Sequence, residues 1–376
     1  MKKLFLILAF AAMPAFAQHE MHGMQHGADM PMMEIGGWRV MIHGAAFLNA
    51  TSQTGPRGRD QLFSTNWAMA SADRPLFDGR LTLRSMVSLE PLFMPQRGYA
   101  ELFQTGETAH GVAIVDSQHP HDFLMELAAQ YDVDLGNETS GYIYAAPVGA
   151  PALGPTAYPH RASAQELPQA TLSHHLQDST HITNNVVTIG GKRGPFSVAV
   201  SGFHGQEPDE NRWDIDGGAI DSWSVRGTWD PMPNLQLQLS TGHLVNPESQ
   251  EPGNVQRTTA SAHLQRGNLA TSLIWGHNQS HGRGTDGITA EANWKFLMSN
   301  YLTGRFELVD KDEIVHDEVF TIAALTLGYT KDIFRSAHLL GGVGGNVTFH
   351  DVPTGLKSEY GSPRSYLVFV RVRGNS

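Results

Sequence analysis

The chain has 376 residues, a formal net charge of −11, 17% charged residues and no cysteine. The lack of cysteine excludes a disulfide scaffold, an iron–sulfur protein and a thiolate zinc site. The acidic balance argues against a nucleic-acid partner, because phosphate binding needs a basic face. The length suits two ordinary domains or one large closed sheet.

Residues 1–17 have the features of a secretory signal peptide. Lys2 and Lys3 precede an apolar stretch of about ten residues, and Ala15 and Ala17 fit the small-residue rule for cleavage before Gln18. The apolar stretch is too short for a spanning helix, and no longer one follows it. We therefore expect an exported protein of the periplasm or of the bacterial outer membrane.

The next segment, 18–34, is polar and rich in histidine and methionine. Thioether and imidazole groups together suit Cu(I), whereas imidazole alone also accepts Cu(II), zinc or nickel. We predict a flexible periplasmic tail that binds a soft metal ion, copper before zinc. The alternative is a solvated tail without a ligand. The candidate ligands are His19, Met21, His22, Met24, His26, Met30, Met32 and Met33.

From about residue 184 to the end, apolar and polar residues alternate, as Leu235, Leu237 and Leu239 do with the residues between them. Alternation with period two is typical of strands with one apolar face. Short connections between the strands alternate with longer ones, and 278–286 is expected to be one of the longer ones. This alternation is typical of a barrel with tight periplasmic turns and longer external loops. Eleven strands are expected after residue 184, and earlier ones near 37–49, 61–71, 79–90, 128–136 and 141–146.

The pattern predicts an all-β fold over residues 35–376, namely a transmembrane antiparallel up-and-down β-barrel. About sixteen strands are expected, and strand numbers from twelve to eighteen are compatible with the pattern. Outer-membrane lipid would contact the apolar face, and charged residues would line a watery lumen. The alternative is a soluble barrel or sandwich with its apolar face inside. The expected lumen residues are Arg84, Glu90, Arg226, Glu291, Lys295, Arg305 and Glu307.

Two long loops, 91–122 and 147–183, carry most of the remaining ligand-type residues and are expected to fold into the lumen. In the first, Pro120 keeps His119 extended, so that His119 and His121 project to one side. In the second, a short helix over 173–181 would place His174, Asp178 and His181 on one face, a spacing that can share a divalent ion. His204, Glu207, Asp209 and Glu210 could add further ligands, of which the three carboxylates supply oxygen. A plug held by hydrogen bonds alone is the other interpretation.

Catalysis at the membrane surface is a further alternative. Ser173, His174 and Asp178, or Ser179 with His181, have the residue types of a nucleophile, a base and an orienting acid. Residues so close in sequence rarely form such a triad, and the HExxH and GxSxG motifs are absent. The sequence therefore assigns no catalytic residue.

Two resemblances bear on function. The signal peptide, the Met/His segment within residues 1–33 and the barrel pattern resemble the copper-resistance outer-membrane proteins, the B component of such operons. The strings LFQTGE, D-x-QHPHD, PALGP, HR-x-SA, LSHH-x-QDSTH and F-x-G-x-EPDE resemble an uncharacterised family of Gram-negative proteins. The resemblance implies binding, tolerance or passage of a transition metal, copper first, with periplasmic copper-handling partners. A general small-solute pore with a polar plug and a surface hydrolase remain as alternatives.

Overall fold

The computed structural model describes residues 32–249, 252–315 and 318–374. The predicted signal peptide and residues 18–31 of the predicted tail lie outside these ranges. The described chain is dominated by strands, with three short α-helices and three 3-10 helices of three residues each. The α-helices are α1 (Glu90–Phe93), α2 (His174–Gln177) and α3 (Lys357–Tyr360), and the 3-10 helices are Tyr158–His160, Ser179–His181 and Thr354–Leu356. No helix in the described ranges has the length and apolar character of a membrane span.

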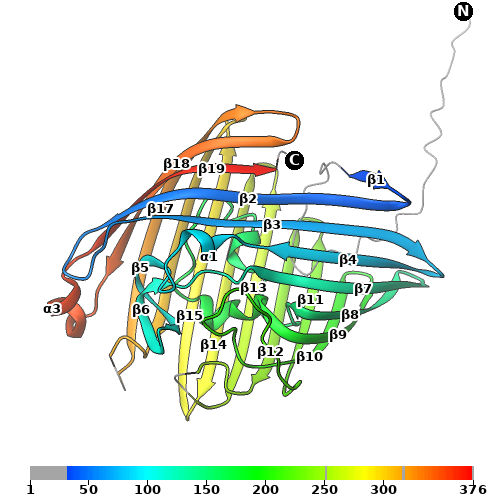
Figure 1. Ribbon diagram of the computed structural model, residues 1–376, viewed down its shortest axis with the longest axis horizontal. Helices are drawn as coiled ribbons and strands as arrows, with labels where there is room; N and C mark the ends of the chain where they lie inside the picture. Colours follow the sequence, from blue (N-terminus) through cyan, green and yellow to red (C-terminus); the bar gives the residue numbers. More distant parts are fainter. Residues whose placement is uncertain (1–31, 250–251, 316–317, 375–376) are drawn as a thin grey trace, which may run out of the picture.

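Sixteen strands of the described chain form a closed antiparallel barrel (Figure 1). Each strand pairs with its neighbour in the ring, and β19 pairs with β2 from Ser365–Gln53 to Arg373–Ala45, which closes the wall. The barrel prediction is thereby confirmed. The strands are β2 (Trp38–Gln53), β3 (Gln61–Leu76), β4 (Gly79–Val87), β7 (Leu124–Gly136), β8 (Thr139–Gly149), β9 (Thr183–Arg193), β10 (Phe196–Phe203), β11 (Ser222–Met232), β12 (Leu235–Leu244), β13 (Val255–Arg266), β14 (Leu269–Ser280), β15 (Arg283–Phe296), β16 (Asn300–Lys311), β17 (Phe320–Arg335), β18 (Leu339–Asp351) and β19 (Arg364–Gly374).

The alternating sequence puts the apolar face of the wall outside. In β19, the side chains of Val368 and Val370 point outward and are 62% and 50% exposed, whereas Arg371 between Val370 and Val372 is fully buried inside. Successive side chains of a strand point to opposite faces, so this pattern repeats around the ring. The soluble alternative, which needs the apolar face inside, is therefore wrong. A continuous apolar exterior matches the hydrocarbon of a membrane.

The two ends of the barrel differ. One end, which we call the short-turn end, carries tight turns such as Asn137–Glu138, together with the start of β2 and the end of β19. The other, the long-loop end, carries segments 88–123, 150–182 and 204–221, and the described parts of segment 245–254 (245–249 and 252–254). The expected long loop at 278–286 is wrong, because β14 and β15 continue to a two-residue turn. His281 and Gly282 both have positive φ there, the geometry of a tight hairpin turn.

The two long loops fold into the lumen, as predicted; we call segments 88–123 and 150–182 together the plug. The first contains α1 and the hairpin of β5 (Tyr99–Ala109) and β6 (Val112–Gln118). β4 ends at Val87 rather than near 90, because Pro91 lacks the amide a ladder needs and fits the first turn of α1. The plug is bonded to the wall: Arg305 donates to the carbonyls of Gln169 and Ala170.

Candidate metal site

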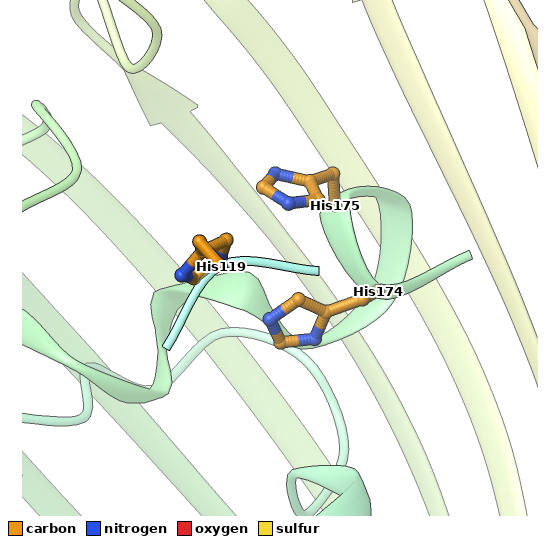
Figure 2. Close-up of side chains that lie close together, drawn as sticks. All are labelled: His119, His174 and His175. Atoms are coloured by element: carbon orange, nitrogen blue, oxygen red, sulfur yellow. The ribbon is translucent and has the colours of Figure 1, made fainter. Parts of the chain in front are cut away.

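Three buried histidines meet inside the plug. His119 follows β6, and His174 and His175 lie on α2, which the chain reaches more than fifty residues later. One ligand nitrogen from each ring lies within 4.8 Å of the others, and the side chains are 7%, 1% and 6% exposed. Figure 2 shows the rings converging from the two segments. This is the spacing at which imidazoles can share one ion.

A carboxylate lies beside each of the three rings. Glu107 Oε1 is 2.9 Å from His119 Nε2, and Asp178 Oδ1 is 2.7 Å from His174 Nδ1. Glu207 Oε2 is 3.5 Å from His175 Nδ1. Metal-binding histidines usually have such a partner, which fixes the ring and makes it a stronger ligand.

The carboxylates themselves are held by arginines from distant parts of the chain. Arg161 bridges Asp178 (Nη1–Oδ2 2.6 Å) and the wall residue Glu291 (Nε–Oε2 2.9 Å). Arg212, from the segment between β10 and β11, pairs with Glu107 and with Asp122 (Nη1–Oδ1 3.1 Å). The pairs of Arg161 link Asp178, and with it His174, to the barrel wall, whereas the pairs of Arg212 link the first plug segment to the loop between β10 and β11.

Burial and charge set the protonation of the three rings. Burial lowers the pKa of His174 to about 4 and also lowers that of His119, so both imidazoles are neutral at pH 7, the form that binds metals. Burial has the same tendency at His175, but Glu207 and Glu248 overcome it and raise its pKa to about 9. The surroundings of His175 therefore favour a positive charge at this position, either a proton on the ring or a metal cation bound to it.

Two further histidines extend the site. His121 donates its backbone amide to Glu90 Oε2, and its Nδ1 is 3.0 Å from the same oxygen. The ring centroids of His121 and His181 are 5.3 Å apart, as are those of His181 and His174. We call His119, His121, His174, His175 and His181 the histidine cluster. Among the described residues, the buried Nε2 atoms of His121, His175 and His181 have no hydrogen-bond partner.

The structure brings together the four histidines that were predicted from the loops, but in a different arrangement. Segment 173–181 is not one helix: α2 ends at Gln177, and a 3-10 turn follows. Asp178 reaches His174 at i,i+4 as expected, whereas His181 Nδ1 lies against the carbonyl oxygen of Asp178, at 2.9 Å. The carboxylate of Asp178 therefore orients His174, and its backbone carbonyl orients His181.

His175 was missed by the sequence reasoning, although the adjacent His174-His175 pair was a signal. Glu207 lies beside this group of histidines, but the other three proposed ligands do not. Glu210 accepts the backbone amides of His110 and Gly111, Asp209 belongs to an exposed group with Asp214 and Asp216, and His204 lies near Asp221. In the predicted tail, only Met32 and Met33 are described among the candidate ligands; both are about half exposed, and Met33 begins β1 (Met33–Ile35). His19, Met21, His22, Met24, His26 and Met30 lie outside the described residues.

The two candidate nucleophiles have partners other than histidine. Ser173 Oγ lies 2.7 Å from Thr289 Oγ1, and Ser179 Oγ accepts a hydrogen bond of 2.8 Å from Arg257. A hydrolase needs its serine bonded to a base. The geometry gives the hydrolase alternative no support.

A hollow of about 160 Å³ lies beside the histidine cluster, between the plug and the wall strands β2, β3 and β19. Glu90 and His121 are in its lining, and so are Arg373 and Gly374, the last residues of β19. Trp67, whose ring centroid is 4.4 Å from that of His160 on the plug, is also in its lining.

A closed sixteen-stranded antiparallel barrel with long loops folded into its lumen has the fold of the porins. The solved structures that it resembles are of this kind. They include OmpF of Salmonella typhi in complex with daunomycin (TM-score 0.58, 8% identity, 91% of this chain and 100% of that chain). They also include an anion-selective porin from Comamonas acidovorans (TM-score 0.59, 11% identity, 90% and 100%). OmpT of Vibrio cholerae is a further example (TM-score 0.53, 8% identity, 91% and 100%).

At these identities the likeness concerns the fold. No family profile matches the sequence, and no curated protein is significantly similar to it.

Proposed function

We propose that this protein is an outer-membrane β-barrel that binds a transition-metal ion inside its plug and serves metal passage or tolerance, with copper as the ion. The observation that carries the proposal is the convergence of His119, His174 and His175 at a buried position in the lumen. The apolar exterior and the porin fold support the location. The long-loop end would then face the outside and the short-turn end the periplasm.

The choice of copper rests on ligand chemistry. An all-imidazole site accepts Cu(II), zinc and nickel, and among divalent ions of this series Cu(II) binds such ligands most tightly. The predicted Met/His tail adds thioethers, which favour Cu(I). Copper is the metal that both ligand sets have in common.

A general pore for small solutes is the rival function. A free pore needs a water-filled lumen, but here the wall arginines Arg257, Arg305 and Arg371 are each at most 1% exposed beneath the plug. The plug that covers these charged groups reduces the open cross-section of the lumen below that of a bare barrel of this size. The plug therefore favours a selective route over an open pore.

The test is a Cu(II) titration of the purified full-length protein in detergent after removal of bound metal. We expect the His119→Ala/His174→Ala/His175→Ala variant to lose one tightly bound Cu(II), together with the multi-nitrogen hyperfine pattern in its electron paramagnetic resonance spectrum. His338→Ala, on an exposed turn, is the matched control and should keep both. Unchanged stoichiometry and spectrum in the triple variant would show that copper does not bind in the plug.

A further inference from the structure

The histidine cluster is extended rather than compact. Neighbouring rings follow one another at centroid distances of 5.9 Å (His119–His175), 5.2 Å (His175–His174), 5.3 Å (His174–His181) and 5.3 Å (His181–His121). A single ion needs only His119, His174 and His175. His181 and His121 lead away from that site, and His121 lies in the lining of the hollow.

We propose that His121 and His181 form a second metal-binding position, through which an ion passes between the three-histidine site and the hollow. The proposal rests on the proposed function, because it takes the same ion as cargo. It makes the plug a passage with successive binding positions instead of a single storage site.

The free ring nitrogens of these two residues support the assignment. In each ring Nδ1 is already bound, by Glu90 in His121 and by the carbonyl oxygen of Asp178 in His181. Nε2 is buried in both and has no hydrogen-bond partner among the described residues. A buried polar atom without a partner is costly, and in a purely structural plug it would normally be satisfied. A histidine anchored at Nδ1 with Nε2 free has the arrangement of a metal ligand.

Glu90 makes the second position attractive to a cation. Its side chain is 2% exposed, and its Oε2 receives both the amide and the ring of His121, while Oε1 accepts the amide of Asn66 at 3.1 Å. The carboxylate is thus fixed at the boundary between the cluster and the hollow. A cation that reaches His121 is therefore attracted to the boundary between the cluster and the hollow.

The other end of the cluster lies beneath the long loops. His175 is within 3.5 Å of Glu207 and 4.0 Å of Glu248, which come from segments 204–221 and 245–254. The side chain of Glu248 is 20% exposed, so this end is in contact with solvent. Carboxylates of the long loops, the histidines of the plug and the hollow beside His121 therefore follow one another inside the barrel.

The experiment measures flux and binding on the same full-length proteins. Each is reconstituted into phosphatidylcholine vesicles that enclose a Cu²⁺-quenched fluorophore, and Cu²⁺ is added outside. We expect His121→Gln/His181→Gln to slow quenching at least tenfold relative to wild type and His338→Ala. In detergent, the same variant should bind one Cu²⁺ fewer and keep the ion at the three-histidine site. Gln preserves size and hydrogen bonding, and heat-modifiable migration on gels verifies that each barrel is folded.

The outcomes separate the two proposals. Wild-type flux in the glutamine variant, with the three-histidine ion still bound, would overturn the passage through His121 and His181. The same conclusion would follow if the fluorophore in vesicles with the wild-type protein were quenched no faster than in protein-free vesicles. If the wild-type protein bound no Cu²⁺ in the plug, the proposed function itself would be overturned.

Discussion

Replacing Arg161 tests whether the plug is held by its buried ion pairs. The side chain of Arg161 is 1% exposed and donates to Asp178 on the plug and to Glu291 on β15 (Nε–Oε2 2.9 Å, Nη2–Oε1 3.1 Å). Arg161→Met keeps the length of the side chain and removes its charge. Asp178 then loses its arginine partner, and Glu291 keeps Arg305 and the hydroxyl of Ser163.

The expected cost follows from leaving buried carboxylates without their partner. Breaking a buried ion pair by removal of one member costs about 3–5 kcal/mol. The matched control is Arg39→Met, because Arg39 is 39% exposed and its partner Asp73 is also paired with Arg80. An exposed pair contributes about 0–1 kcal/mol. The two identical substitutions should therefore differ by roughly 2–5 kcal/mol.

Urea unfolding in detergent, followed by tryptophan fluorescence, measures this difference. Trp67 on β3 packs against His160 on the plug, so its emission reports displacement of the plug from the wall. Single-channel conductance in planar bilayers gives a second readout, and Arg161→Met should show more frequent and larger openings than Arg39→Met. Equal unfolding free energies, within about 1 kcal/mol, would refute the role of Arg161 as the link between plug and wall.

Other residues give independent tests. Asp178→Asn should weaken Cu(II) binding roughly 10- to 100-fold in a calorimetric titration, because the orienting partner of His174 is lost; unchanged affinity would contradict that role. Burial and the nearby Glu307 raise the pKa of Glu101, in the plug hairpin, to about 8, so the folded state binds this proton more tightly than the unfolded state. Stability should fall by up to a few kcal/mol as the pH rises from about 4.5 to 8, and Glu101→Gln should flatten that slope in thermal melts. Leu239, 61% exposed near the middle of β12, faces outward, and Leu239→Arg should destabilise the barrel in bilayers by about 2–4 kcal/mol. A neutral effect there would mean that the exterior contacts water.

The candidate site was only partly accessible from the sequence. His119, His121, His174 and His181 stood out because they cluster in two long loops of an otherwise economical strand pattern. Of the supporting residues, Glu207 was named from the sequence, but Glu107 and Arg212 were not. Glu107 lies on β5, whereas Glu207 and Arg212 lie in the segment between β10 and β11. They meet only because the loops fold inward and the barrel closes around them.

The sequence by itself determined the barrel, because the alternation of apolar and polar residues is local and assigns each side chain to one face of a strand. It also identified the loops that carry ligand-type residues. Only the tertiary structure decided the ends of the strands, the turn at His281–Gly282 and the membership of the histidine cluster. These depend on register between strands and on contacts between loops distant in sequence, which no local pattern encodes.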